Sequence, residues 1–457
     1  MKFRNLLNKK IILGVFLTGT IALGTIALGT ITFGTINNSA IAKTVKNKYE
    51  MLEIFVEIMT NIEENYVEEI DSDKLIKSAI KGMISDLDPH STFLDEKDFD
   101  RLNESTTGEF AGVGMTVQQD KKTKYMLVVS PIDATPAFKA GMKSGDLVIE
   151  IDDVPTDTIT FSEGIDMLRG KPNTDVNLKI WREDASKQLD ITITRAIIKV
   201  PSVKADVKNK NIGYIRITSF QDNTQAQLEK AFKKINKMTK GKVRGYILDL
   251  RNNPGGLLSK AISVSDSFLN QGEIVSTRGR DKTKAQRWNA KKGDMAQGLP
   301  VVILINRGSA SASEIVAGAL QDHKRALLVG ETSFGKGSVQ SIQQISKKMA
   351  IKFTTARYYT PSGRSIQGLG ITPDVVIKSL VISEEVKDAK YTEASLKGSI
   401  KNNQIKNSKK KKSKAKKERK KDKNGKPIME KSLNFGDYIL ARGLNAMDAL
   451  IAAKDMK

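Results

Sequence analysis

Residues 301–340 constrain the fold of this chain more than any other stretch. An apolar run at residues 301–305 breaks at a turn, alternating serine and alanine follow, and Glu314 then opens a helical pattern. The run predicts a buried strand, and the change of period predicts a tight turn into a helix. A serine at such a turn lies at a helix N-terminus, where free N–H groups and the helix dipole favour developing negative charge. The turn therefore suits a nucleophile, and the alternative is a serine that only caps the helix.

The flanking segments extend this pattern into an α/β fold. Further apolar runs predict strands, and amphipathic stretches predict helices between them, at residues 211–220, 224–237, 245–250, 257–269 and 326–329. Strands that alternate with helices form right-handed βαβ units and a largely parallel sheet. Gly255 and Gly256 stand where the strand at residues 245–250 turns into its helix. Two adjacent glycines let the backbone expose N–H groups to a nearby group, as an oxyanion hole requires.

A lysine bracketed by Gly335 and Gly337 follows the strand at residues 326–329. A serine hydroxyl needs a base to remove its proton during attack, and a lysine is such a base only when it is neutral. Burial disfavours the ammonium form, so packing Lys336 between strands would lower its pKa. Gln340 carries an amide oxygen that can accept a hydrogen bond from the amine without adding a charge. The alternative is that Lys336 is a solvated loop residue.

Three serines, Ser309, Ser311 and Ser313, compete for the role of nucleophile. Side-chain direction changes from residue to residue along a turn, so only one of them is expected to face a site shared with Lys336. We favour Ser311.

The composition removes several other kinds of catalysis. The chain has 457 residues, no cysteine and only two histidines, His90 and His323. The lack of cysteine excludes thiol catalysis, disulfides and cysteine-bearing zinc sites. A Ser-His-Asp triad would have to use one of the two histidines, and His90 stands in a turn beside Pro89, where a structural role is the simpler expectation. Because clustered ligands are scarce, we expect no metal and no cofactor.

The formal net charge of +23 is unevenly distributed. Residues 408–426 contain twelve Lys or Arg and two acidic residues, so this run holds ten of the net positive charges. Such a block repels itself and buries nothing, and it contains no aromatic residues to stack on bases. We expect a disordered insertion and no nucleic-acid partner.

The N-terminus has the pattern of an export signal. Four basic residues lie within the first ten, an uncharged apolar run covers residues 11–36, and Ala40-Ile41-Ala42 matches a signal-peptide cleavage site. The run is also long enough to span a bilayer, so a cleaved signal and a membrane anchor both stay open. Either one places the rest of the chain outside the cytoplasm, in the bacterial periplasm or cell envelope.

Two patterns separate this segment from the α/β region. Residues 49–87 place apolar side chains at helical spacing and predict two or three amphipathic helices, which end before Pro89. Residues 108–198 then contain short strands and turns around one helical stretch at residues 161–168, and this order resembles a PDZ domain. In that family a glycine-containing loop binds a peptide's terminal carboxylate while the peptide adds a strand to the sheet edge. The corresponding loop here is Gly112, Val113, Gly114 and Met115, and its apolar residues would favour an apolar last residue.

Taken together, four motifs in order resemble the C-terminal processing peptidases, also called tail-specific proteases. They are Leu-Asp-Pro-His-Ser at residues 87–91, Asp-Leu-Arg-Asn-Asn with two glycines at residues 249–256, Ser309 to Glu314, and the stretch from Gly330 to Gln340. The resemblance runs from about residue 49 to residue 376, with a closing helix at residues 435–453.

The resemblance implies a role for each site residue. Ser311 would be the nucleophile, Lys336 the general base, and Gln340 the residue that orients the lysine amine. The N–H groups of Gly256, or of its neighbour Gly255, and of Ala312 would form the oxyanion hole. Arg169, at the end of the PDZ helix, matches a position linking PDZ docking to the protease core, and a solvated helix-end arginine is the alternative.

The implied fold is a multidomain α/β protein. Its core would be a crotonase- or Clp-protease-like ββα core built of βαβ units. A PDZ domain, β-sandwich-like with two helices, is inserted in this core, and further helices lie at the N-terminus. The expected parts are a signal peptide or anchor at residues 1–42, a helical dimerisation segment at 43–104, the PDZ domain at 105–198, the protease core at 199–385, a basic insertion at 386–430 and a C-terminal helix at 431–457.

The predicted function is that of an exported serine endopeptidase. It would recognise the free, apolar C-terminal tails of protein substrates through its PDZ domain and cleave them with a Ser-Lys dyad. We expect a homodimer or higher homo-oligomer, and the N-terminal segment, if it is kept as an anchor, would attach it to the membrane. Two other classes stay open. One is a non-catalytic PDZ adaptor of the cell envelope, and the other is an envelope protein that binds anionic polymer through residues 408–426.

Overall fold

The computed structural model describes residues 38–183, 187–347, 349–377, 392–400, 402, 404 and 437–456. Most of the expected export segment and the lysine-rich residues 408–426 lie outside these ranges. Within them, no helix combines the length and the apolar character needed to cross a bilayer. The chain divides into two compact units, residues 1–76 and residues 77–457.

The first unit is helical in its described part. It contains α1 (Asn38–Asn65) and the first residues of α2 (Ser72–Ser85). Large apolar side chains of α1 are exposed, namely Tyr49, Met51, Leu52, Ile54, Phe55, Val56, Ile58 and Ile62. The prediction of two or three helices in residues 49–87 is confirmed, with two helices found.

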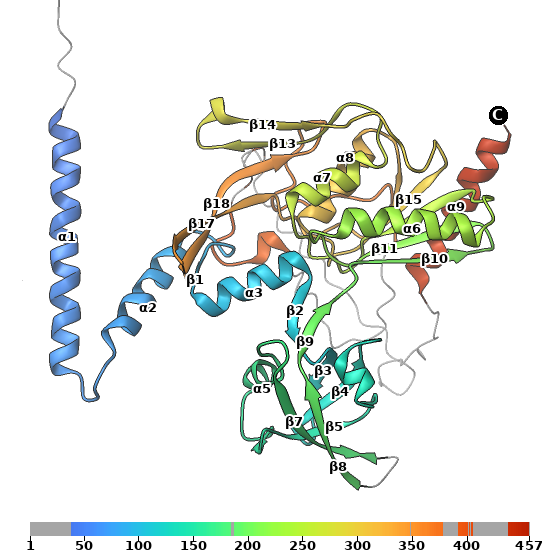
Figure 1. The fold of residues 1–457 in the computed structure, drawn as a ribbon. Helices are drawn as coiled ribbons and strands as arrows, with labels where there is room; N and C mark the ends of the chain where they lie inside the picture. Colours follow the sequence, from blue (N-terminus) through green and yellow to red (C-terminus); the bar gives the residue numbers. More distant parts are fainter. Residues whose placement is uncertain are drawn as a thin grey trace, which may run out of the picture. The chain divides into compact units, whose positions relative to one another are not determined.

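The second unit is built on a central six-stranded sheet (Figure 1). Its strand order is β10 (Val203–Lys208), β11 (Ile212–Ile217), β12 (Gly245–Asp249), β15 (Val301–Ile305), β16 (Leu327–Gly330) and β19 (Val375–Val376). β10 and β11 pair antiparallel, and the other neighbours pair in parallel. This arrangement confirms the largely parallel sheet expected from alternating strands and helices.

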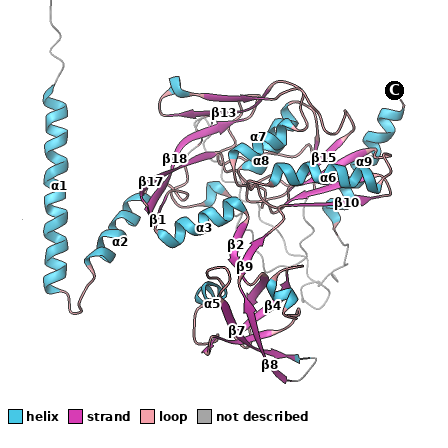
Figure 2. Cartoon of the chain, viewed as in Figure 1, coloured by secondary structure: helices cyan, strands magenta, loops and turns pink. Residues whose placement is uncertain are grey.

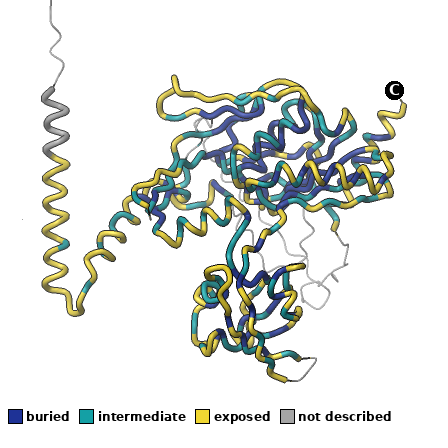
Figure 3. The backbone as a smooth tube through the Cα atoms, viewed as in Figure 1, coloured by how far each residue is buried: buried dark blue, intermediate teal, exposed yellow. Residues whose placement is uncertain are grey.

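Helices cover both faces of the central sheet (Figure 2). One face packs against α6 (Thr224–Met238), α7 (Leu258–Asp266) and α8 (Ala312–Asp322), and the other packs against α9 (Tyr438–Asp455). Successive residues of a strand point to opposite faces, so Ile303 belongs to the first core and Val302 to the second. β12 and β15 are buried along their whole length, and the buried segments in Figure 3 concentrate in this layer. Such strands read as continuous apolar runs in sequence.

A second sheet carries the segment that follows Lys336. Its strands are β1 (Thr92–Leu94), β18 (Met349–Tyr359), β13 (Glu273–Gly279) and β14 (Gln286–Asn289) in that order, with β17 (Ser338–Ser346) paired to β18. α3 (Glu96–Thr107) follows β1, and a short 3-10 helix, η3 (Glu393–Ser395), lies in the described segment 392–400. Because β1 pairs with β18, the turn that contains His90 is held close to this sheet.

The expected PDZ segment folds as a small antiparallel sheet with two helices. Its elements are β3 (Met115–Gln119), β4 (Met126–Pro131), α4 (Pro136–Lys139), β5 (Leu147–Ile151), β6 (Val154–Pro155), α5 (Phe161–Leu168), β7 (Asp175–Arg182) and β8 (Lys187–Thr194). The sheet order is β3-β4-β5-β7-β8, so β3 is an edge strand. A ribbon of β2 (Glu109–Gly112) and β9 (Ala196–Lys199) joins this part to the rest of the unit.

The fold is thus a mixed α/β structure with N-terminal helices, as the sequence predicted. The closing helix expected at residues 435–453 is present as α9. The finer description of the core as crotonase- or Clp-protease-like stays a prediction.

Candidate active site

Ser311 occupies a strained position at the N-terminus of α8. Its φ is +55°, a left-handed conformation that residues other than glycine rarely adopt. Strain of this kind is stored mainly at functional sites, and strand-to-helix turns that expose a nucleophilic serine are an example. Ser311 is half-buried, so its hydroxyl lies at the edge of the core rather than inside it.

The two competing serines have structural partners. Ser309 and Ser313 are fully buried. The Ser309 hydroxyl donates to the Leu250 carbonyl at 2.8 Å, and the Ser313 hydroxyl donates to the Asn253 carbonyl at 3.0 Å. These two hydrogen bonds attach the serine turn to the segment that follows β12. Because both hydroxyls have this structural role, Ser311 is the candidate nucleophile.

Gly255 and Gly256 lie directly beside this turn. Their φ angles are +107° and +139°. A Cβ on Gly255 would stand 2.7 Å from the Cβ of Ser311, and a Cβ on Gly256 would stand 2.2 Å from the Phe220 carbonyl oxygen. Both positions therefore require glycine, because of backbone angle and because of space.

The backbone N–H groups decide between the two glycines as oxyanion donors. The N–H of Gly255 donates to the Asn253 side chain at 2.9 Å. Within the described residues, no hydrogen bond occupies the N–H of Gly256 or of Ala312. Ala312 is the first residue of α8, where backbone N–H groups lack helical partners and the helix dipole is positive. Gly256 and Ala312 are thus the better candidate pair.

A cavity of about 430 Å³, which we call the serine cavity, brings these groups together. Ser311, Gly256, Ala312, Gln340 and Tyr358 line it. Most of its remaining wall is apolar and comes from five elements or turns, with Leu102, Phe220, Leu257, Leu258, Ile315, Val339 and Ile342 as lining residues. The amide nitrogen of Gln340 donates to the Ser338 hydroxyl at 2.8 Å, which leaves its amide oxygen to accept a hydrogen bond.

Lys336 belongs to a short segment, residues 334–337, which we call the lysine loop. Burial and the nearby charge of Lys352 lower the pKa of Lys336, while Glu393, Asp88 and Glu314 act in the opposite direction. Lys336 itself is not a lining residue of the serine cavity. Among the residues that the structure describes, no hydrogen bond joins its amine to the Ser311 hydroxyl.

Tyr358, which the sequence analysis did not single out, stands between the serine and the lysine. Its phenol donates to the carbonyl of Lys336. Burial raises the pKa of Tyr358 well above its ordinary value, the Glu314 carboxylate adds to this, and the Ser311 hydroxyl acts against it. Tyr358 is therefore a neutral hydrogen-bonding group at neutral pH.

Glu314 is a second residue whose role the sequence analysis missed. This fully buried carboxylate accepts four hydrogen bonds, from Ser311 N–H (2.8 Å), Ser333 Oγ (2.6 Å), Gly335 N–H (2.7 Å) and Lys336 N–H (2.9 Å). Burial raises its pKa to about 7, although those hydrogen bonds oppose the shift. Glu314 thus joins the nucleophile turn to the lysine loop. The Ser-x-x-Glu spacing of a capping box is the sequence signal that points to it.

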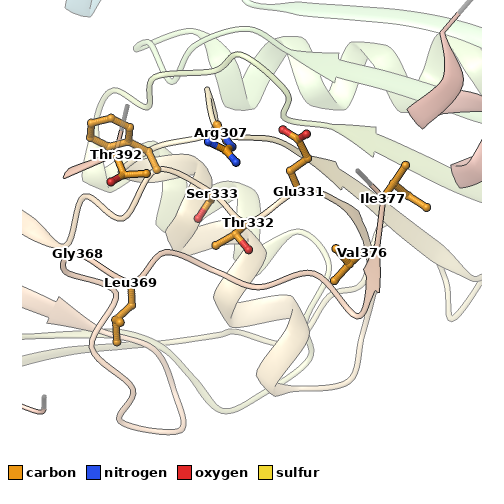
Figure 4. Close-up of a pocket in the computed structure, with 10 residues that line it drawn as sticks. Arg307, Glu331, Thr332, Ser333, Gly368, Leu369, Val376, Ile377 and Thr392 are labelled. Atoms are coloured by element: carbon orange, nitrogen blue, oxygen red, sulfur yellow. The ribbon is translucent and has the colours of Figure 1, made fainter. Parts of the chain in front are cut away.

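A second cavity, of about 490 Å³, lies along the segment that leads to the lysine loop (Figure 4). Thr332 and Ser333 line it from the segment after β16, and Gly368 and Leu369 line it from the loop after β18. None of the predicted catalytic residues lies in it.

The aspartate and arginine of the motif at residues 249–256 have a structural role. Asp249 is fully buried and accepts hydrogen bonds from Tyr214 Oη (2.7 Å), Arg216 (3.0 Å) and Arg251 (2.6 Å). Arg251 in turn pairs with Asp437, the residue that caps α9, at 2.6 Å. Hydrogen bonds from Arg251 and Tyr214, with the charge of Arg251, hold the pKa of Asp249 below its usual value even though burial acts against this. The network fixes the end of β12 just before the glycine turn.

The predicted peptide-binding loop borders the open edge strand of the PDZ segment. Val113 is buried. Gly114 has a φ of +81°, and a Cβ at this position would collide with the side chain of Thr135. Gly112 forms an isolated antiparallel bridge with Arg169. Met115 begins the edge strand β3, whose free side can accept an added strand.

Arg169 joins the PDZ helix to α3. Its guanidinium pairs with Glu104 of α3 and lies 5.3 Å from the centre of the Phe110 ring. A second pair, Arg101 with Asp166 at 2.8 Å, joins the same two helices. α3 contributes Leu102 to the serine cavity, so these contacts join the PDZ segment to an element that lines this cavity.

The two histidines lie elsewhere. His90 Nε2 is 2.6 Å from the Glu393 carboxylate, and His323 Nε2 is 2.7 Å from the Glu273 carbonyl. Neither is a lining residue of the serine cavity.

Comparisons with known proteins agree with this arrangement. A model of peptidase family S41 matches residues 211–377, a PDZ domain model matches residues 111–193, and a model described as the activating protease CtpB N-terminal domain matches residues 32–98. The chain is 48% identical over 359 residues to a carboxy-terminal-processing protease of Bartonella bacilliformis, which covers 78% of this chain and 82% of that relative.

Two further relatives carry similar names. The chain is 37% identical over 336 residues to the carboxy-terminal processing protease CtpA of Bacillus subtilis, covering 73% of this chain and 70% of the relative. It is 38% identical over 311 residues to a carboxyl-terminal-processing protease of Synechocystis, covering 67% and 72%. On this similarity the chain belongs to the carboxy-terminal processing proteases of peptidase family S41, which are serine-type proteases with a PDZ domain.

Proposed function

We propose that this protease cleaves peptide bonds with Ser311 as nucleophile and Lys336 as general base. The observation that carries the proposal is the strained Ser311 turn beside two backbone donors, Gly256 N–H and Ala312 N–H, which no group in the described part of the chain occupies. Ser311 Oγ attacks the scissile carbonyl while the Lys336 amine takes its proton. The two N–H groups bind the oxyanion, and the lysine ammonium then protonates the leaving amine. Water completes hydrolysis of the acyl-enzyme by the same route.

The proposal includes a movement of the lysine amine toward Ser311 when a tail binds. The charges that act on Lys336 include those of Lys352, Glu393 and Asp88, and none of these residues lines the serine cavity. Gln340 does line it, and its amide oxygen, which is not engaged by any described residue, is the acceptor that would orient the amine on arrival.

The substrate is the C-terminal tail of a protein. We propose that the tail adds a strand to β3, that its carboxylate binds the N–H groups of residues 112–115, and that the apolar wall of the serine cavity accepts an apolar side chain near the scissile bond. The ion pairs of Arg169 and Arg101 with α3 and α5 would pass tail binding on to the cavity.

Three wider features belong to the same proposal. The exposed apolar residues of α1 support self-association as a homodimer or higher homo-oligomer. The N-terminal sequence supports export to the periplasm or cell envelope, with residues 1–42 as signal or anchor. The domain boundaries stay those expected from the sequence, with the PDZ domain near residues 105–198 and the protease core near 199–385.

The test is cleavage of a peptide with a free, apolar C-terminus. We expect Ser311→Ala and Lys336→Ala each to abolish turnover, while Ser259→Ala, another serine that lines the cavity, retains it. An amidated peptide should be cut more slowly, because the terminal carboxylate is lost. Normal turnover by Lys336→Ala would exclude lysine as the base. Tight peptide capture by the wild type without any cleavage would favour a PDZ adaptor instead.

A further inference from the structure

The backbone of the lysine loop is completely paired. The N–H groups of Phe334, Gly335, Lys336 and Gly337 donate to Ser309 O (3.0 Å), Glu314 Oε1 (2.7 Å), Glu314 Oε2 (2.9 Å) and Gln367 Oε1 (2.9 Å), in that order. Their carbonyls accept from Glu393 N–H (3.2 Å), Gly368 N–H (2.8 Å), the Tyr358 phenol and Tyr358 N–H (3.0 Å). A loop with every polar group bonded has its position set by those partners.

One partner, Gln367, begins a buried chain of side chains. Its amide oxygen accepts the Gly337 N–H, and its amide nitrogen donates to Glu393 Oε1 at 2.8 Å. The other carboxylate oxygen of Glu393 lies 2.6 Å from His90 Nε2. Gln367 and Glu393 have no exposed surface, and the His90 side chain is 15% exposed. The chain therefore leads from the surface at His90 to the backbone next to Lys336.

A carboxylate without any contact with water needs partners, because an unpaired buried charge is strongly destabilising. Glu393 has a side-chain partner on each carboxylate oxygen, and its own N–H binds the lysine loop at Phe334. Glu393 is thus attached to the lysine loop twice. Its backbone N–H binds Phe334 directly, and its carboxylate binds Gln367, which in turn binds Gly337.

We propose that His90 and Glu393 are positioning residues of the reaction: through Gln367 they hold the lysine loop in place, and they keep one negative charge at a fixed place near the base. This inference rests on the proposed role of Lys336 as base. His90 acts by holding Glu393 and has no contact with the reacting atoms.

The geometry predicts an effect on turnover rather than on substrate binding. Removing the His90 ring takes one of the two side-chain partners from Glu393, so the carboxylate, Gln367 and Gly337 are free to shift together. Gly337 directly follows the base, and a misplacement of about 1 Å in a reacting group lowers rates by about 100-fold. Neither His90 nor Glu393 lines the serine cavity, so KM should change little.

The charges around Lys336 predict a second effect. The charged groups that act on its amine are Lys352 on β18, Glu393 in η3, Asp88 in the turn before β1 and Glu314 on α8. Lys352 lowers the pKa of Lys336, and the three carboxylates raise it. Replacing Glu393 by glutamine removes one of the raising charges and keeps the shape, so the pKa of Lys336 falls. Because the base works in its neutral form, the rise of kcat/KM with pH then moves to lower pH.

The experiment measures kcat, KM and the pH profile of peptide cleavage for His90→Ala, His90→Gln and Glu393→Gln. We expect His90→Ala to lower kcat by roughly 10- to 100-fold with KM within about twofold. His90→Gln keeps an N–H donor and should recover most of the loss. Glu393→Gln should move the profile to lower pH. The matched control is His323→Gln, since this other histidine binds the part-buried backbone carbonyl of Glu273, and the variant should leave kcat and the profile unchanged.

Thermal unfolding of the same variants separates positioning from folding. The inference is overturned by wild-type kcat in His90→Ala, by a kcat loss that matches the lost folded fraction, or by a pH profile of Glu393→Gln that coincides with the wild type. Lys336→Ala distinguishes this failure from failure of the proposed function. If Lys336→Ala is active, the base itself is wrong. If it is inactive while the His90 and Glu393 variants behave like the wild type, only the positioning roles are wrong.

Discussion

The serine turn and the lysine loop are held in place by different kinds of contact. Ser311 is positioned by contacts between two adjacent turns, with Ser309 and Ser313 bonded to backbone carbonyls after β12 and the glycine turn packed against Ser311. The lysine loop depends on side chains from distant parts of the chain, and His90 and Glu393 are 303 residues apart in sequence.

The difference follows from what each group needs. A nucleophile needs a defined direction and nearby donors, which the turns after two neighbouring strands, β12 and β15, supply. A lysine that acts as base needs a desolvated place with controlled charge, and only the packing of several elements creates such a place. The serine side should therefore respond most to changes of backbone shape, and the lysine side to changes of charge.

Among changes that keep Ser311 and Lys336, the largest effect is expected from Gly256→Ala, which disturbs the serine side. Its Cβ would lie 2.2 Å from the Phe220 carbonyl, at a φ of +139°. We expect kcat to fall by roughly 100-fold or more, as for loss of an oxyanion donor, with a loss of about 1–3 kcal/mol in the free energy of unfolding. Gly141→Ala is the control, because Gly141 also has a positive φ but open space around it. Wild-type kcat in Gly256→Ala would contradict the assignment.

Glu314→Gln tests the contact that joins the two sides. Glutamine offers one acceptor oxygen to donors that now share two, so Ser311 and the lysine loop lose their common anchor. We expect kcat to fall by roughly 10- to 100-fold with a smaller change in KM. Equal kcat in the two proteins, measured with the same peptide, would show that the serine turn and the loop hold their positions independently.

The same carboxylate predicts a pH dependence of stability. Its pKa is about 7 in the folded protein against 4.5 as its ordinary value. Between these pH values the folded state binds more protons than the unfolded state, so the free energy of unfolding decreases as pH rises. Compared with Glu314→Gln, the wild type should lose about 3 kcal/mol between pH 4.5 and pH 8. Urea unfolding of both proteins at the two pH values measures it, and parallel pH dependences would contradict the raised pKa.

A smaller effect is expected from Lys352→Gln, which changes charge on the lysine side. Removing this positive charge raises the pKa of Lys336, so the rise of kcat/KM moves to higher pH, opposite to the shift of Glu393→Gln. Lys352→Arg keeps the charge and should keep the profile. Identical pH profiles for the glutamine and arginine variants would exclude an electrostatic role for Lys352.

The smallest effect is expected away from both sides, at the exposed pair of Arg101 and Asp166. Exposed ion pairs contribute about 0.2–1 kcal/mol, so Arg101→Gln should change cleavage by no more than a few-fold. Arg169→Gln, which also removes a contact to the Phe110 ring, should have the larger effect of the two. A larger loss of cleavage in Arg101→Gln than in Arg169→Gln would show that Arg101 provides the main coupling between α5 and α3.

Sequence reasoning predicted best where function follows from local pattern. The apolar run at residues 301–305 leads directly into the serine turn, and the glycine pair follows the neighbouring parallel strand β12. The structure places Ser311, Gly256 and Ala312 around one cavity. The alternation of strands and helices likewise predicted the central sheet.

The residues that were missed act through tertiary contacts. Tyr358 is an ordinary strand residue in sequence, and only the pairing of β18 with β17 places its phenol at the Lys336 carbonyl. Glu393 lies in a stretch that sequence assigned to a basic insertion, and its burial depends on packing against Phe334 and Gln367. His90 was recognised as a turn residue, but its partner could not be read from its neighbours.

The position of α9 makes the oxyanion turn depend on a late part of the chain. The helix covers one face of the central sheet, and its capping residue Asp437 binds Arg251, which holds the end of β12 ahead of the oxyanion turn. A growing chain that already contains Ser311 and Lys336 still lacks this cover and this ion pair. The catalytic turn is then completed only after about 120 more residues have followed Ser311.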